Sequence, residues 1–436
     1  MFSSSDSSSA SVTAKTTADS LEARYQDIRR ATERLTAPLS AEDCAVQSMP
    51  DCSPAKWHLA HTSWFFETFV LERELAGYQH FNPAFRVLFN SYYKTVGEQY
   101  ARPQRGLLTR PGLDEVMKYR RYVDNHLMKL FRERGAVTGR LAAVLELGLQ
   151  HEQQHQELIL TDIKHLLSFN PLHPGYRDNN ADDAVAQALR WHRYEEGIRR
   201  IGHDGDGFCF DNEQPRHRVF IEAFELASRP VTNGEYLEFI RDGGYERPEL
   251  WLSDGWNSVQ SFGWQAPLYW QRQDDDYFVY TLSGLRALNP DEPVCHVSCY
   301  EADAYARWAG ARLPTEMEWE DVASGLPLEG NFVESGRLHP ASLAARRETS
   351  SPAQMFGDVW EWTGSPYSPY PGFQPLAGEL GEYNGKFMCN QMVLRGGSCV
   401  TPRSHIRASY RNFFPPAARW QFSGIRLARD VHPPAK

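Results

Sequence analysis

The sequence predicts a multidomain protein, in which a helical bundle is followed by a loop-rich α+β domain with little regular secondary structure. Two observations predict this arrangement. Apolar residues recur at helical intervals up to about residue 185, whereas from about residue 200 the chain is rich in Gly, Pro, Trp and Tyr and its apparent strands are short. We therefore expect a disordered tail over residues 1–20, a helical domain over 21–185 and a second domain over 190–436.

Four amphipathic helices are expected in the first part, and four such helices favour a bundle. Ser53 is the expected N-cap of the second helix, and Gly135 is expected to end the third. The connection over residues 77–111 is long, which is typical of a functional loop. The helices are expected at residues 21–35, 53–76, 113–134 and 140–167. In the second part, helices are expected near 233–241 and 300–310.

Composition excludes several classes of protein. The net charge of −10 argues against nucleic acid or an anionic membrane as the main partner. No apolar run approaches the roughly 20 residues that span a bilayer, and the first 20 residues lack the apolar stretch of a secretory signal. The seven cysteines match no disulfide framework. We expect a cytoplasmic protein with small-molecule partners, while a homo-oligomer stays open.

The main chemical feature is the run His151-Glu152-Gln153-Gln154-His155. Positions i and i+4 share one face of a helix, so both imidazoles can bind one metal ion. A third ligand must come from another helix, and His58 and His61 lie in an otherwise apolar, aromatic helix. Their spacing does not separate them, and a structural role for the histidines is the alternative.

The choice of metal stays open at this point. The run also fits the HExxH pattern of zinc proteases, in which the glutamate activates water, but no downstream third ligand follows it. A set of three imidazoles leaves coordination positions open, which suits redox iron that binds both oxygen and substrate. Composition alone does not choose between zinc and iron.

Several phrases mark a resemblance to known families. The first half resembles the DinB-like bundle, in which a histidine of one helix joins a pair from another. The second half resembles the formylglycine-generating-enzyme fold, which is related to C-type lectins. The joined halves resemble the sulfoxide synthases of ergothioneine biosynthesis and their ovothiol relatives. The matching phrases of the second half are residues 293–310, 312–320, 357–363, 394–398 and 424–427.

The resemblance implies a non-haem Fe(II) enzyme that uses O2 to join a thiol to C2 of the hercynine imidazole. The implied iron ligands are His61, His151 and His155, and His58 falls outside the matched position. Gln154 matches the glutamine that contacts the substrate imidazole, although by helix geometry Glu152 also flanks the histidines.

The resemblance also implies substrate contacts in the C-terminal segment, residues 409–430. Asn412 and Phe413 match the cradle for the trimethylammonium group of hercynine, and aromatic faces suit a cation without N–H donors. Phe414 and Ala418 stand where the γ-glutamylcysteine branch carries an acidic residue and an arginine, so we expect cysteine as the thiol. A core role for the phenylalanines is the alternative.

The long loop of the first half offers the remaining candidates. Tyr92 and Tyr93 are adjacent, so we expect them to point in different directions and one of them to donate a proton to iron-bound oxygen. Tyr383 is the alternative from the second half. Arg102 and Arg105 are candidates for clamping a substrate carboxylate.

Other functions stay open. Within the family these are the same reaction with γ-glutamylcysteine as the thiol, or with histidine as the acceptor. Outside it they are a cysteine dioxygenase, a zinc-dependent thiol transferase, and a non-catalytic module with a lectin-like half.

Overall fold

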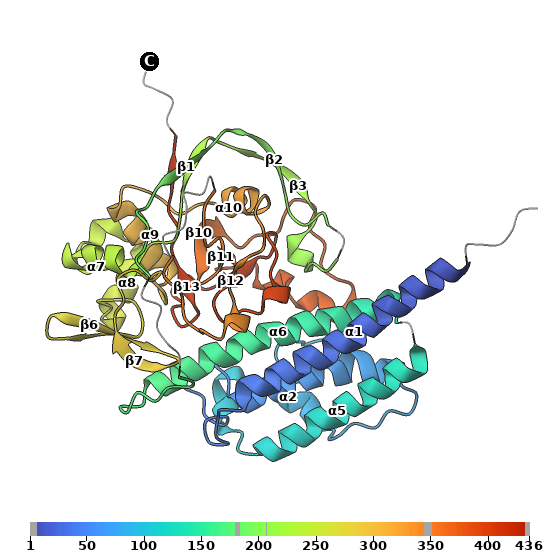
Figure 1. Cartoon of the computed structure of the whole chain (residues 1–436). Coiled ribbons are helices and arrows are strands. Elements are labelled where there is room, and N and C mark those ends of the chain that lie inside the picture. The colour runs from blue at the N-terminus through green and yellow to red at the C-terminus, as the bar shows by residue number, and fades with distance from the viewer. Residues whose placement is uncertain (1–6, 136, 179–183, 206, 344–350, 432–436) are drawn as a thin grey trace, which may run out of the picture. The chain divides into compact units, whose positions relative to one another are not determined.

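The computed structural model divides the chain into two compact units, residues 1–166 and 167–436. The structure describes residues 7–135, 137–178, 184–205, 207–343 and 351–431 (Figure 1). Within these residues no helix is both long enough and apolar enough to cross a membrane.

The first unit is a bundle, in which four long helices of the described residues run side by side (Figure 1). Ion pairs join the helices: Arg24 binds Glu146, and Arg29 binds Asp124. The long helices are α1 (Ser7–Thr36), α2 (Ala55–Phe66), α5 (Leu113–Arg134) and α6 (Gly139–Ser168). The shorter ones are the π-helix η1 (Glu67–Leu71), α3 (Glu72–Glu74), α4 (Phe85–Leu88) and the 3-10 helix η2 (Arg102–Leu107).

The helix α2 is the centre of the bundle, because every one of its residues is buried. A helix that is apolar all round can only be stable when its neighbours cover it on all sides. The predicted N-cap was wrong, since Pro54 holds that position and no side chain caps the helix. Ser53 instead donates its backbone N–H to Asp162 Oδ2 of α6 at 2.8 Å.

The third and fourth expected helices of the first unit agree closely with the structure, whereas the first differs at its start. The third runs over Leu113–Arg134 and ends at Gly135, which has a φ of 62°. The fourth is one residue longer at each end than expected. The first begins earlier than Leu21, so the predicted tail overlaps α1, and residues 1–6 lie outside the described part of the chain.

The second unit combines short helices with five small sheets among its described residues. Helices are α7 (Asn233–Arg241), α8 (Ser253–Phe262), α9 (Cys299–Trp308) and α10 (Glu316–Ala323). Three sheets have the orders β1-β4-β14 (Trp191–Tyr194, Phe224–Ala227, Ala428–Asp430), β2-β3 (Gly197–Ile201, His217–Ile221) and β5-β6-β7 (Trp270–Gln273, Asp276–Thr281, Gly284–Ala287). The others are β8-β9 (Gly330–Asn331, Phe356–Gly357) and β12-β11-β10-β13 (Asn412–Phe414, Met392–Arg395, Trp360–Pro366, Ser423–Gly424).

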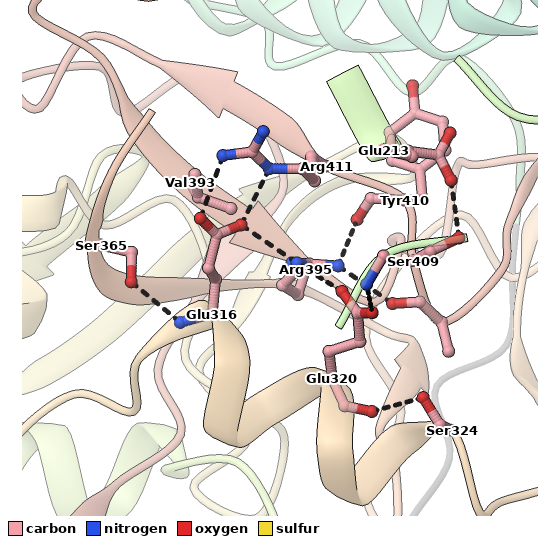
Figure 2. A network of polar contacts seen from close by, with 12 residues as sticks. Glu213, Glu316, Glu320, Ser324, Ser365, Val393, Arg395, Ser409, Tyr410 and Arg411 are labelled. Carbon is pink, nitrogen blue, oxygen red and sulfur yellow. Dashed lines mark hydrogen bonds and ion pairs between the residues drawn. The ribbon is translucent and has the colours of Figure 1, made fainter. Parts of the chain in front are cut away.

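A buried ionic network ties α10 to the four-stranded sheet (Figure 2). Arg395 of β11 donates to Glu316 at 3.0 Å and to Glu320 at 2.8 Å, and Arg411 also donates to Glu316. All four side chains are buried, so each charge has its partner in the interior. This network fixes β11, and β12 pairs with β11 along Asn412–Phe414.

Candidate metal centre

Three imidazoles from two helices converge inside the first unit. His61 comes from α2 and His151 and His155 from α6, and their ring nitrogens lie within 4.8 Å of one another. The Nε2 atom of His151 is 3.2 Å from Nε2 of His61 and 3.1 Å from Nε2 of His155. Two nitrogens bound at ~2.1 Å and at right angles to one ion are ~3.0 Å apart, so the three rings already have the spacing of ligands to a single metal.

Close packing of α2 against α6 brings these rings together. Gly148 lies one turn before His151, and a Cβ atom at that position would stand 2.5 Å from the ring of Phe66 and 2.9 Å from the ring of Phe65. Only a glycine allows the two helices to approach this closely. Gly148 is therefore needed for the histidines of α2 and α6 to converge.

His61 is held in a defined orientation and tautomer. Its Nδ1 lies 2.6 Å from the backbone oxygen of Phe89, which can only accept, so Nδ1 carries the proton and Nε2 is left as a ligand. The ring is stacked between Trp57, at 4.6 Å and 15°, and Trp64, at 5.5 Å and 16°.

His58 does not join the three converging nitrogens but lies behind His155. The two Nδ1 atoms are 2.7 Å apart, and Nε2 of His58 is 3.1 Å from Asp162 Oδ2. Sequence reasoning missed Asp162. A signal existed, because Asp162 lies seven residues after His155 and eleven after His151, on the same face of the helix.

Burial keeps the three imidazoles neutral and therefore available as metal ligands. Burial lowers the pKa of His151 to about 3 and the pKa values of His61 and His155 well below the ordinary range. The rings are therefore neutral at ordinary pH. With all three rings protonated on Nδ1, their Nε2 lone pairs converge on one point, and this donor set fits a metal.

Glu152 is not part of the centre, although it lies between the two histidines in sequence. Its carboxylate accepts hydrogen bonds from Arg29 at 2.9 Å, Arg120 at 3.0 Å and Thr32 at 2.7 Å. These arginines hold the pKa of Glu152 at about 2 against the effect of burial. A carboxylate engaged in this way is not poised to activate water, so the HExxH interpretation loses its general base.

The two candidate tyrosines do not diverge as expected. Their rings stack on each other at 4.7 Å, because the loop folds back around the paired Asn90 and Tyr93. Tyr93 is buried against Trp64 at 5.6 Å, and Trp64 stacks on His61. The pair is thus connected to the histidines through one indole ring, while its role as proton donor stays a prediction.

Arg105 and Arg102 differ in environment. Arg105 is 3% exposed, lies 3.4 Å over the ring of Trp57 and donates to Ser53 Oγ at 2.9 Å. Among the described residues no carboxylate forms an ion pair with it; Asp162 acts on it by Coulomb attraction only, and burial lowers its pKa to about 9. It lines a small pocket with Lys56, Trp57 and Phe89. Arg102 is exposed and donates to the backbone oxygen of Asp51.

The candidates of the second unit fall into separate aromatic groups. Phe413 stacks on Tyr367 at 4.1 Å and 9° and lies 5.9 Å from Phe387. Asn412 precedes it and accepts a hydrogen bond from its backbone N–H. In the other groups, Phe414 packs against Trp420 and the buried Tyr383 stacks on Phe210.

Gln154 is half-buried and lies one helical turn after His151. Gln154 and His151 lie on the same face of α6, whereas Glu152 is engaged in ion pairs with two arginines of other helices. The geometry is compatible with the predicted contact between Gln154 and substrate, which stays a prediction.

Comparison with known families assigns both halves. Residues 24–159 match the DinB superfamily, and residues 193–351 and 344–431 match the sulfatase-modifying factor enzyme 1-like domain. The chain is 38% identical over 306 residues to the hercynine oxygenase of Mycolicibacterium thermoresistibile, which covers 65% of this chain and 68% of that protein. The chain belongs to the hercynine oxygenase family.

Other relatives match shorter stretches of the chain. The hercynine oxygenase of Mycolicibacterium smegmatis is 42% identical over 243 residues, or 51% of this chain and 56% of that protein. Ergothioneine biosynthesis protein 1 of Schizosaccharomyces pombe is 29% identical over 237 residues, or 51% of this chain and 28% of that protein. The chain thus aligns with little more than half of the M. smegmatis protein. The expected family and the expected order of a DinB-like bundle and a formylglycine-generating-enzyme-like domain are confirmed.

Proposed function

We propose that this protein is a non-haem Fe(II)-dependent sulfoxide synthase that joins cysteine to C2 of the hercynine imidazole. The observation that carries the proposal is the convergence of three neutral Nε2 atoms at 3.1 and 3.2 Å. Membership of the hercynine oxygenase family supports the acceptor and the use of O2.

The donor set supports iron over zinc hydrolysis. His61, His151 and His155 would hold the ion, and three protein ligands leave positions open for thiol and oxygen. Ferrous iron supplies the redox chemistry, which Zn²⁺ lacks. Glu152, the residue that a zinc hydrolase would use as a base, is held by two arginines.

The reaction balances with one O2 for each product. Formation of the C–S bond removes two electrons in total, with one proton from the thiol and one proton from C2 of the imidazole. Oxidation of sulfur to the sulfoxide removes two more electrons, so O2 is reduced by four electrons. One oxygen atom enters the sulfoxide and the other leaves as water.

Residues of the first unit have separate tasks in this reaction. Gln154 orients the hercynine imidazole, and Tyr92 or Tyr93 supplies a proton to reduced oxygen. Arg105 binds a substrate carboxylate, which would give this buried guanidinium the anion that the described residues do not provide. Arg102 and Tyr383 remain further predicted substrate contacts.

In the second unit, Asn412 and Phe413 contact the trimethylammonium group of hercynine. Phe413 is a half-buried aromatic ring of the kind that binds a cation without N–H donors, and Tyr367 covers one of its faces. Phe414 and the buried Ala418 offer no charge to a second carboxylate, which favours cysteine over γ-glutamylcysteine.

The test is aerobic incubation of the Fe(II)-loaded protein with hercynine and, separately, cysteine or γ-glutamylcysteine. Oxygen uptake and product mass are measured, and histidine competes with hercynine in a parallel series. We expect the cysteine–hercynine sulfoxide, and His151→Ala should abolish it. Sulfinate formed without hercynine would instead indicate a dioxygenase, and absence of O2 uptake would contradict the proposal.

The carboxylate contact has its own test in Arg105→Met. Loss of the guanidinium should raise the KM for the substrate whose carboxylate it binds by about 10- to 100-fold, the range of a lost charge-assisted hydrogen bond. Steady-state kinetics with each substrate varied in turn measure this, with Arg30→Met, an exposed arginine of α1 outside the candidate site, as the comparison. Unchanged KM values for both substrates would contradict the assignment.

A further inference from the structure

We propose that His58 and Asp162 are positioning residues for the metal, because they form a relay that holds His155 in the tautomer that binds an ion through Nε2. The inference deepens the proposed function and rests on its metal centre. The relay would keep Nε2 of His155 free of a proton and directed at the ion.

The contacts of the relay are short and buried. Asp162 Oδ2 lies 3.1 Å from His58 Nε2, and His58 Nδ1 lies 2.7 Å from His155 Nδ1. His58 and Asp162 are 2% and 7% exposed, so water does not compete for these atoms. The backbone N–H of Ser53 donates to the same oxygen of Asp162 at 2.8 Å and fixes the carboxylate in place.

The positions of the protons follow from the chemistry of the groups. A carboxylate can only accept, so the proton between Asp162 and His58 belongs to His58 Nε2. Nδ1 of neutral His58 is then an acceptor, and the proton between the two Nδ1 atoms belongs to His155. His155 Nε2 is left without a proton, facing Nε2 of His151.

The opposite arrangement would disable the ligand. If His58 carried its proton on Nδ1, it would donate to His155 Nδ1, and His155 would carry its own proton on Nε2, where no metal can bind. Asp162 makes that arrangement unfavourable because it would leave a buried carboxylate without its imidazole donor. The backbone oxygen of Phe89 fixes the tautomer of His61 in the same way, by accepting the proton of its Nδ1. The tautomers of His61 and His155 are therefore fixed by different acceptors.

Metal affinity tests the relay with three variants and a control. In Asp162→Asn the amide can donate to His58 and permits the wrong tautomer, and His58→Leu removes the acceptor of His155. Both should raise the dissociation constant for Co(II) or Fe(II) by about 10- to 100-fold, the range found for partners of metal-bound histidines. His58→Asn retains an oxygen near the position of Nδ1 and should recover part of the affinity.

The matched control is His165→Leu. His165 is a buried histidine of the same helix α6, and its Nδ1 lies 2.7 Å from Ser48 Oγ. This variant removes a buried imidazole that hydrogen-bonds to Ser48 and acts on Asp162 through its charge. Because burial lowers the pKa of His165, the ring is neutral at pH 7.5, and metal affinity should stay within about twofold of the wild type. Near-UV circular dichroism identifies the folded variants.

A second readout needs no metal. Nitrogen-15 NMR of histidine side chains in the metal-free protein should show His155 protonated on Nδ1 and His58 on Nε2, and Asp162→Asn should shift both. His155 protonated on Nε2 in the wild type would overturn the proposal, as would wild-type metal affinity in folded His58→Leu and Asp162→Asn. A wild type that binds no metal would overturn the metal centre, whereas the NMR result still decides the relay. If His58→Leu does not fold, Asp162→Asn and His58→Asn decide the affinity test.

Discussion

At the scale of single residues, side chains within one turn of α6 have different roles: the histidines converge on the candidate metal centre, and Glu152 forms structural ion pairs. His151 and His155 face the centre, whereas Glu152 faces Arg29 and Arg120 of two other helices. All of these side chains are buried, and neighbouring positions of one helix therefore have unrelated tasks.

This division predicts the outcome of Glu152→Gln. The change removes the carboxylate that Arg29 and Arg120 share, while Arg29 keeps its ion pair with Asp124. The free energy of unfolding should therefore fall by about 3 kcal/mol, the lower end of the range for a broken buried ion pair. The metal dissociation constant of the folded protein should stay within about twofold of the wild type, as expected for a residue outside the centre. Urea unfolding and Co(II) titration measure the two quantities, and unchanged stability together with lost metal binding would contradict the assignment.

The candidate site could be predicted in part from residue spacing. The i, i+4 pair in a helix indicated a shared ligand face, and that indication agrees with the converging nitrogens. Spacing did not separate His58 from His61, because three residues apart on a fully buried helix both point into the interior. The identity of the third imidazole depends on α6, which lies about 90 residues further along the chain.

At the scale of elements, the π-helix η1 changes how α2 ends. The sequence predicted one continuous helix to about Ala76, because an apolar pattern on all sides carries no mark of a π turn. Glu67 opens this segment and accepts from Tyr119 Oη at 2.6 Å and Tyr78 Oη at 2.8 Å. The carboxylate thereby anchors the segment to α5 and to the start of the long loop.

We expect Glu67→Leu to lower the free energy of unfolding by about 2–4 kcal/mol, because Tyr119 is fully buried and would lose its acceptor. Urea unfolding measures the change. Glu72→Gln is the matched control five residues later, where an ion pair with Arg86 is half exposed and should contribute less than about 1 kcal/mol. Equal effects of both changes would contradict the anchoring role.

Helix starts in the second unit carried a readable signal. Thr232, Ser298 and Thr315 each form a capping box with the glutamate three residues later, at the starts of α7, α9 and α10. The capping box identifies α10, which the apolar pattern alone did not reveal. No side chain caps α8, so no comparable signal marked its start.

At the scale of the whole molecule, the order of the two units along the chain could be predicted from the sequence, but the pairing of the strands could not. The bundle follows from local periodicity, as the agreement of α5 and α6 shows. The sheet β1-β4-β14 instead joins residues near 191 to residues near 430. Such pairing depends on contacts between distant parts of the chain, which composition and short patterns do not encode.

The buried histidines predict how stability depends on pH. His61, His151 and His155 have folded pKa values below the unfolded value of about 6.5, so the unfolded state binds more protons below that pH. Stability of the metal-free protein is therefore fully present above pH ~6.5 and falls on acidification toward the folded value of about 3 for His151. Each histidine contributes up to about 1.4 kcal/mol per pH unit in this range.

Urea unfolding of the metal-free protein at pH 7.5, 6.5 and 5.5 measures this dependence. His151→Leu should show a shallower decline than the wild type, because one of the titrating imidazoles is missing. A wild-type stability that is equal at all three pH values would contradict the prediction.

The seven cysteines, which form no disulfide, have a practical consequence. Five are buried and Cys209 is half-buried, where burial raises its pKa to about 11, so among them only Cys389 is exposed. A maleimide fluorophore should therefore attach once to the native protein, at Cys389, and at seven positions after unfolding, as intact mass would show. The second unit thus carries a natural attachment point for a single fluorescent label.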